Sequence, residues 1–266
     1  MSVKFSIIHL SDLHFGRIHS ETLDHLDDFL IKRNDEIKMA IVTGDLTQRA
    51  RKREFLAAGQ FMKSLNHPLF VVPGNHDVPL YNLWLRFFKP YRQFLKYLGP
   101  FSQNYYEDED VAVFGLWTVN NFAAQTGKLR QNDLEEIENR FQNVPAGKIK
   151  IIACHHPLLS IKRPRIKNDI ERITRLSPHF ILWGHEHQSS IVHMKENEIF
   201  PIILASGTTT SSRIRTETNS FNYIRFFDDK FHIEVYRHSR KQGSFEMFDQ
   251  KEFKLREDER PPLNFF

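Results

Sequence analysis

Five short polar motifs each follow directly on an apolar run, and this arrangement most constrains how the chain can fold. The motifs are Ser11-Asp12-Leu13-His14, Gly44-Asp45, Gly74-Asn75-His76-Asp77, His155-His156-Pro157 and Gly184-His185-Glu186-His187. The apolar runs before the first three, at residues 3–10, 39–43 and 68–72, are rich in β-branched and aromatic side chains and have the length of buried strands. Ligand-type side chains therefore stand at the ends of predicted strands.

Amphipathic helices are predicted between these strands, including one at residues 51–65 with apolar side chains at helical spacing. Three successive units of strand, polar loop and helix predict a parallel sheet, whose ligands gather beyond the carboxyl ends of the strands. We therefore expect Asp12, Asp45 and Asn75 to lie along one rim.

The second half of the chain continues the pattern. Strands are predicted at residues 111–119, 148–153 and 179–183, and helices at 132–141 and 170–176. From about residue 190 onward, short alternating runs predict strands of a second, largely antiparallel sheet. The expected fold class is α/β, with two sheets face to face and helices outside. Because 266 residues suffice for one large core, we expect a single domain spanning 1–266.

Residues 80–101 interrupt the alternation with the aromatic, basic stretch LYNLWLRFFKPYRQFLKYLGPF. We predict two short helices separated at Pro90, with basic residues from Arg86 to Lys96 at roughly helical spacing. Three interpretations of this insert are open: packing of its aromatic side chains on the domain, which we favour, a lid, or peripheral contact with lipid or membrane through residues 81–101.

Composition excludes several classes of protein. The single cysteine, Cys154, excludes an internal disulfide framework and a thiolate zinc cluster, and we expect it in the core. It fits a reducing compartment, so we expect a cytoplasmic protein, with a membrane-peripheral location as the alternative. No apolar run is long enough for a membrane span, and residues 1–10 are too short for a signal peptide. The net charge of +4 does not favour a nucleic-acid partner or a nuclease.

The motif side chains predict a metal centre. Imidazole, carboxylate and amide groups suit Mn²⁺, Fe or Zn²⁺, and their presence at five successive strand ends is hard to explain as plain turns. Two cations held close together need a bridging anion, which one carboxylate with two oxygens provides. We predict Asp45 as this bridge.

The five motifs, in this order, resemble the calcineurin-like metallophosphoesterase family over about residues 4–187. Within the family, the opening 11–16 and the later Asn219-Ser220-Phe221-Asn222 are most similar to bacterial 3′,5′-cyclic nucleotide phosphodiesterases. The resemblance implies a four-layer α-β-β-α sandwich of two mixed sheets. It also implies two metal ions, one held by Asp12, His14, Asp45 and His187, and the other by Asp45, Asn75, His155 and His185. No ligand position is missing.

A metal centre of this kind indicates that the protein hydrolyses a phosphoester. Two metal ions bind the nonbridging oxygens of the ester and lower the pKa of a bridging water, so that hydroxide attacks phosphorus. We predict that His76 supplies a proton or positive donor to the leaving oxygen, and that Asp77 orients it. Four basic features are candidate contacts for substrate phosphate, although a solvated surface is the favoured interpretation for each: Arg17, the run 162–167, Arg213 and Arg215.

Hydrolysis of phosphodiesters, with 3′,5′-cyclic nucleotides as the suggested substrate, is the leading functional prediction. One alternative is a peripheral lipid hydrolase that cleaves a nucleotide-lipid pyrophosphate of the lipid A precursor type and uses the insert at 81–101. Familiar enzymes of that kind look as though they carry Arg where this chain has His76, which counts against it. A further alternative is a catalytically inactive metal-binding scaffold, but such proteins usually lack ligands. The sequence makes no prediction of oligomeric state.

Overall fold

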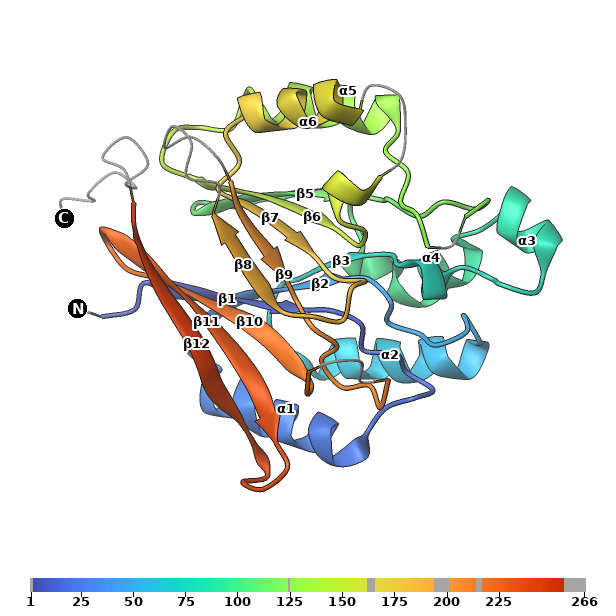
Figure 1. The fold of residues 1–266 in the computed structure, drawn as a ribbon, viewed down its shortest axis with the longest axis horizontal. Helices are drawn as coiled ribbons and strands as arrows, with labels where there is room; N and C mark the ends of the chain where they lie inside the picture. Colours follow the sequence, from blue (N-terminus) through green and yellow to red (C-terminus); the bar gives the residue numbers. More distant parts are fainter. Residues whose placement is uncertain (1, 124, 162–165, 194–200, 214–216, 256–266) are drawn as a thin grey trace.

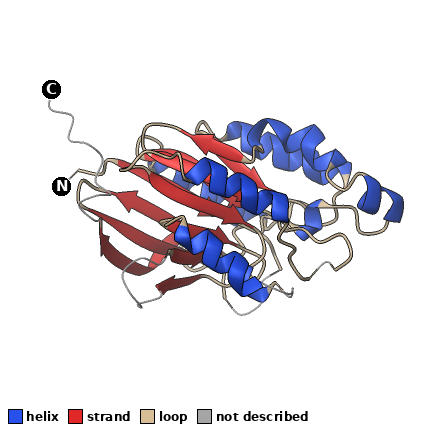
Figure 2. Ribbon diagram, turned by 90° about the horizontal axis from the view of Figure 1, so that it is seen from above, coloured by secondary structure: helices blue, strands red, loops and turns tan. Residues whose placement is uncertain are grey.

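Two six-stranded sheets lie face to face, with helices on their outer faces (Figures 1 and 2). The computed structural model describes residues 2–123, 125–161, 166–193, 201–213 and 217–255. The first sheet has the order β12 (Ser244–Lys254), β11 (Lys230–Ser239), β10 (Ser220–Phe226), β1 (Phe5–Leu10), β2 (Ile37–Thr43) and β3 (Leu69–Val72). The second has the order β4 (Tyr105–Glu107), β5 (Val111–Leu116), β6 (Ile149–Cys154), β7 (Phe180–Trp183), β9 (Ile202–Ala205) and β8 (Ser190–His193).

Three apolar layers hold the fold together. Helices α1 (Ser20–Lys32) and α2 (Lys52–Ser64) pack on the first sheet, and α5 (Gln131–Phe141) and α6 (Ile166–Arg175) on the second. The middle layer joins the sheets, with Ile41 of β2 and Ile151 of β6 in the same buried cluster. Every residue of β1 is buried because both faces of the strand are covered. The predicted α/β sandwich of two mixed sheets is confirmed.

The strands after residue 190 do not form a sheet of their own, so that prediction is wrong. β8 and β9 join the second sheet, where β9 is parallel to β7, whereas β10 is antiparallel to β1 in the first sheet. β10 buries Tyr223 toward the helices and Ile224 toward the other sheet, and a strand with two apolar faces fits only inside a covered sheet. The alternation of side chains along each run therefore did not specify which strand it would pair with.

The insert divides into two helices, as predicted, but they differ in packing. Helix α4 (Arg92–Leu98) buries Phe94 and Leu98, and the ring of Tyr97 stacks on that of Phe55 in α2 at 6.1 Å between centroids. Helix α3 (Leu83–Phe88) leaves its aromatic side chains exposed. The packing interpretation is thus confirmed for α4 and wrong for α3.

Among the described residues, the remaining helices are three short 3₁₀ turns: η1 (Asn75–Asp77), η2 (Gly99–Phe101) and η3 (Leu158–Ser160). Cys154 is fully buried, as expected. Within the described part of the chain, no helix combines the length and apolar character that crossing a bilayer requires.

Candidate metal centre

The structure brings all seven predicted ligand residues together at the ends of five strands. In the first group, Asp12 follows β1 and its Oδ1 atom lies 3.1 Å from His187 Nε2 and 3.6 Å from His14 Nε2. The two imidazole nitrogens are 3.4 Å apart. One carboxylate oxygen and two imidazole nitrogens thus converge on a single point in the interior.

The second group lies beside the first. Asn75 Oδ1 is 3.1 Å from both His155 Nε2 and His185 Nδ1. Asp45 joins the groups, since its Oδ2 lies 3.3 Å from His155 Nε2 and 4.0 Å from His14 Nε2. Its other oxygen accepts a hydrogen bond from the backbone N–H of His76 at 2.8 Å. Asp45 therefore faces both groups through one oxygen, and not through two as the sequence analysis assumed.

These donors fit metal ions. Asp12 Oδ1 is completely buried, and the Nε2 atoms of His187 and His14 lie 3.1 and 3.6 Å from it. Converging lone pairs in a buried place cost free energy unless protons or a cation lie between them. Imidazole, carboxylate and amide oxygen without thiolate suit first-row divalent ions.

The charges of the two groups are strongly coupled. Burial opposes ionisation of Asp12, but hydrogen bonds with His14 and His187 outweigh it and hold the pKa of the carboxyl well below its usual range. For His155, burial is outweighed by Asp45, which raises the pKa to about 9. Burial and the neighbouring His155 lower the pKa of His185 to about 4. Without a cation the carboxylates hold protons on nearby imidazoles, so metal binding must release protons.

The backbone is strained at the ligand positions. Five of the seven predicted ligands have positive φ angles: Asp12 (52°), His14 (51°), Asp45 (53°), His185 (69°) and His187 (59°). Such residues are uncommon outside glycine and cost about 1–3 kcal/mol each, so the surrounding structure must hold them.

A ladder of threonine hydroxyl groups supplies part of that restraint. Thr208, Thr209 and Thr210 donate hydrogen bonds to the carbonyl oxygens of Asp12, Ser11 and Leu13, at 2.7, 2.9 and 3.0 Å respectively. The sequence analysis missed these residues. Three consecutive threonines, separated from the apolar run of β9 by Ser206 and Gly207, were the available signal.

Two glycines allow the backbone to pass very close to side chains of the ligand loops. A Cβ atom on Gly184 would lie 1.8 Å from Ser11 Oγ and 2.5 Å from Asp12 Oδ2. A Cβ atom on Gly74 would lie 2.1 Å from Asp45 Oδ1. No other residue fits at either position without moving a ligand loop.

His76 and Asp77 have different surroundings. His76 Nδ1 is 2.7 Å from the carbonyl oxygen of Gln48. The Asp77 carboxylate accepts hydrogen bonds from the backbone N–H groups of Thr47 (2.8 Å), Gly74 (3.0 Å) and Leu46 (3.2 Å). The His76 ring is therefore oriented by Gln48 and not, as predicted, by Asp77, which instead holds two ligand loops together.

Arg213 reaches the centre, in contrast to the favoured surface interpretation. Its guanidinium Nη1 lies 3.1 Å from His76 Nε2, and its carbonyl oxygen lies 3.2 Å from His187 Nδ1. Among the other cationic candidates, Arg17 and Lys167 are exposed, whereas residues 162–165 and Arg215 lie outside the described residues.

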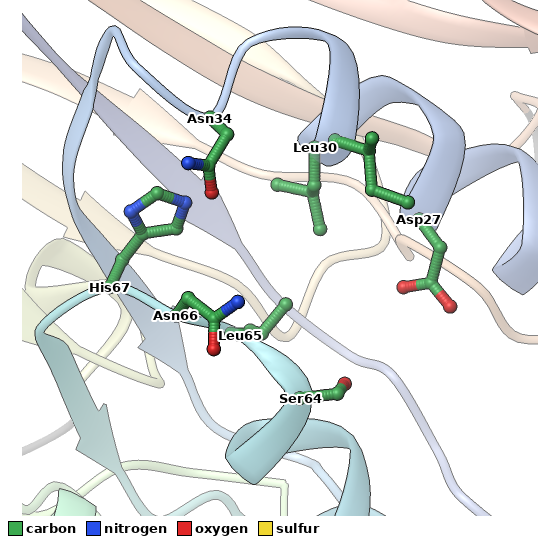
Figure 3. A pocket seen from close by; sticks show the side chains of 8 residues that line it. Asp27, Leu30, Asn34, Ser64, Leu65, Asn66 and His67 are labelled. Atoms are coloured by element: carbon green, nitrogen blue, oxygen red, sulfur yellow. The ribbon is translucent and has the colours of Figure 1, made fainter.

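Of two depressions in the protein surface, one adjoins the candidate metal centre and the other does not. An open one of about 560 Å³ adjoins His185 and has a polar lining: Gln125, Ser160, His185, Glu186 and Gln188. Another, of about 180 Å³, lies between the last turns of α1 and α2 (Figure 3). Figure 3 shows one imidazole there, that of His67, beside Asn34 and Asn66, and none of the predicted ligands. Of these two depressions, only the first adjoins a predicted ligand.

Comparison with known proteins defines the class. A family model described as calcineurin-like phosphoesterase matches residues 5–189, and the chain belongs to this family. A probable cyclic nucleotide phosphodiesterase from Vesicomyosocius okutanii is 23% identical over 246 residues, which cover 85% of this chain and 96% of that protein. The 3′,5′-cyclic adenosine monophosphate phosphodiesterase CpdA from Haemophilus influenzae is 27% identical over 169 residues, covering 59% of this chain and 57% of that protein.

Among solved structures, the purple acid phosphatase PPD1 from yellow lupin shares the fold. It aligns with a TM-score of 0.61 at 14% identity, covering 95% of this chain and 54% of that one. The family predicted from the motifs is confirmed, as is the class of enzyme, a hydrolase of phosphoric esters.

Proposed function

We propose that the chain is a dinuclear metal-dependent phosphodiesterase whose substrates are 3′,5′-cyclic nucleotides. The observation that carries the proposal is Asp45 Oδ2, which faces His155 Nε2 at 3.3 Å and His14 Nε2 at 4.0 Å. One oxygen between two groups of donors is what two neighbouring cations require. The names of two relatives supply the substrate class.

The proposed ligand sets are those given by the resemblance. Asp12, His14, Asp45 and His187 would hold one ion, and Asp45, Asn75, His155 and His185 the other. Bound there, the ions would supply charge neutralisation for a phosphodiester and acidify a water molecule. Mn, Fe and Zn are the proposed ions, since the donor set suits all three.

The protein groups opposite the ligands would deal with the leaving oxygen. The carbonyl of Gln48 accepts the Nδ1 proton of His76, which turns Nε2 toward Arg213 and the centre. We propose that His76, when both of its ring nitrogens carry a proton, donates the Nε2 proton to the leaving oxygen, and that the Arg213 guanidinium meets the developing charge on that oxygen by electrostatics.

The open depression beside His185 supports a small polar substrate. Its volume of about 560 Å³ lies in the usual range for small-molecule sites. Gln125, Ser160 and Gln188 offer amide and hydroxyl groups that can hydrogen-bond a nucleobase or ribose. An acyl chain would find little apolar surface among these residues.

The test is hydrolysis of bis-p-nitrophenyl phosphate and of 3′,5′-cyclic AMP by protein loaded with Mn²⁺, with Asp45→Ala and His76→Ala as variants. We expect both variants to lose at least about 100-fold in kcat, whereas His67→Ala, the matched control in the remote pocket, retains full activity. Retained diester cleavage in Asp45→Ala would overturn the dinuclear site. Cleavage of the model diester without cleavage of any cyclic nucleotide would overturn the substrate class.

The second candidate is hydrolysis of a nucleotide-lipid pyrophosphate. The exposed aromatic side chains of α3, such as Trp84 and Phe88, favour it. Detergent-dependent cleavage of such a lipid, with no cleavage of cyclic nucleotides, would select it.

A cytoplasmic location stays a prediction from the single cysteine. The inactive-scaffold alternative loses its basis, because all seven ligand residues converge.

A further inference from the structure

Helix α3 has the reverse of the usual arrangement of apolar and charged side chains. Leu83, Trp84 and Phe88 are 62%, 58% and 71% exposed, whereas the only charged residue of the helix, Arg86, is 5% exposed. A surface helix normally buries its apolar side chains and exposes its charges. This helix therefore presents its apolar side chains outward.

The buried arginine fixes that orientation. Arg86 Nε donates a hydrogen bond to the carbonyl oxygen of Asn121 at 2.7 Å, and Nη1 donates to that of Pro79 at 3.1 Å. A buried guanidinium needs such partners, because leaving it without them is costly. Since Arg86 is held on the inner side, the residues on the other sides of α3 point away from the domain.

The exposed side chains form one surface with a neighbouring loop. Phe122, which is 83% exposed, contacts the ring of Phe87 with 5.1 Å between centroids, and the rings of Trp84 and Phe88 are 5.7 Å apart. We call this surface the aromatic patch; it comprises Tyr81, Leu83, Trp84, Phe87, Phe88 and Phe122. It is an exposed group of large apolar side chains, which marks an interaction site more often than single exposed residues do.

Two cations border the aromatic patch, most of which lies in a part of the chain that has no acidic residue. Residues 78–106 contain four basic residues and no Asp or Glu. The ammonium group of Lys89 lies 6.0 Å from the Trp84 ring, and the guanidinium group of Arg49 lies 5.7 Å from the Tyr81 ring. Arg49 begins a run of exposed cations that continues with Arg51, Lys52 and Arg53. A partner for this surface must accept apolar side chains and carry negative charge at the same time.

We propose that the aromatic patch docks the protein on a bilayer surface that contains anionic phospholipid. Trp, Tyr, Phe and Leu bordered by Lys and Arg are the residues that settle at the boundary between headgroups and acyl chains. Each Lys or Arg close to an anionic membrane adds attraction. Nucleic acid fits less well, because aliphatic Leu83 offers no stacking surface for bases and the whole chain carries a net charge of only +4.

The position of α3 suits a flat surface. The helix projects beyond the sheets at the right-hand end of the molecule in both views (Figures 1 and 2), so it can reach a bilayer before the sheets do. Its anchor also links it to the metal centre, since Pro79, which accepts from Arg86, follows Asp77 by two residues. The inference does not depend on the substrate of that centre.

The test is cosedimentation of the full chain with vesicles of phosphatidylcholine alone and with vesicles that also contain phosphatidylglycerol. We expect binding only to the anionic vesicles, weakened by salt, with a blue shift of tryptophan fluorescence. The double variant Trp84→Ser/Phe88→Ser should lose at least about tenfold in vesicle affinity. Lys89→Glu should lose about fivefold at low salt. The matched control, Ile31→Ser/Met247→Ser, removes two exposed apolar side chains elsewhere and should bind like the parent.

Hydrolysis of bis-p-nitrophenyl phosphate should be unchanged in the Trp84→Ser/Phe88→Ser variant, which shows that the fold is intact and keeps this test separate from that of the catalytic proposal. Absence of binding to anionic vesicles by the parent protein would overturn the proposal, as would equal binding by the double variant. Self-association or binding of a single-stranded oligonucleotide that the double variant loses, without vesicle binding, would assign the patch to a different partner and also overturn it.

Discussion

Replacement of Asp77 by alanine should destabilise the protein, with loss of activity as a consequence. The carboxylate is fully buried and accepts from the N–H groups of Leu46, Thr47 and Gly74. Each buried donor without an acceptor costs about 1–3 kcal/mol. Water can enter the space that alanine leaves, so we take the lower limit and expect a loss of about 3 kcal/mol in the free energy of unfolding. For a chain of this size that lowers Tm by about 6–12 °C.

The assay is urea unfolding of metal-free protein in a chelator, followed by diester hydrolysis with Mn²⁺. The loss should persist without metal, because the three hydrogen bonds join protein groups. His76→Ala is the control next in sequence: its ring is held by Gln48 and Arg213, so it should lose activity and less than about 1 kcal/mol of stability. An Asp77→Ala protein with the parent's stability but without activity would refute the reasoning and return Asp77 to the chemistry.

Three further predictions follow from the structure. Gly184→Ala should lower Tm and weaken metal binding, since its methyl group would lie 2.5 Å from Asp12 Oδ2, whereas Gly99→Ala, with nothing within 4 Å, should do neither; calorimetry with and without Mn²⁺ checks both. Arg172→Gln should cost about 0.5 kcal/mol at pH 7. Arg172 lowers the pKa of Glu138 below 4.5, so this stabilisation is present above pH 4.5 and should vanish in urea unfolding at lower pH. Removal of metal by a chelator should lower Tm, and Mn²⁺ at about 100 times its Kd should restore about 3 kcal/mol; an unchanged Tm would contradict a built metal site.

The sequence by itself determined the class of fold and predicted which ligand-type side chains would meet. Asp12, Asp45 and Asn75 each follow an apolar run, and parallel strands must end at one rim, so their meeting could be predicted from local pattern alone. Gly184 also indicated that the backbone passes close to other side chains at this position, because it stands directly before a pair of ligand-type histidines.

Only the tertiary structure decided contacts between residues far apart in the chain. The use of one Asp45 oxygen depends on the His76 amide. The role of Asp77 depends on the amides of Leu46 and Thr47 in the loop after β2, and the place of Arg213 depends on the segment after β9. The same holds for the C-terminal strands, since alternation within a strand says which side chains share a face but not which neighbour covers it.

Helix α3 shows most clearly what a local sequence pattern cannot predict. Its spacing of Leu83, Trp84 and Phe87 predicts an apolar face, and burial of such a face is the general expectation. The face is exposed because Arg86 finds carbonyl acceptors in a loop some 35 residues away, a long-range contact that no local pattern encodes.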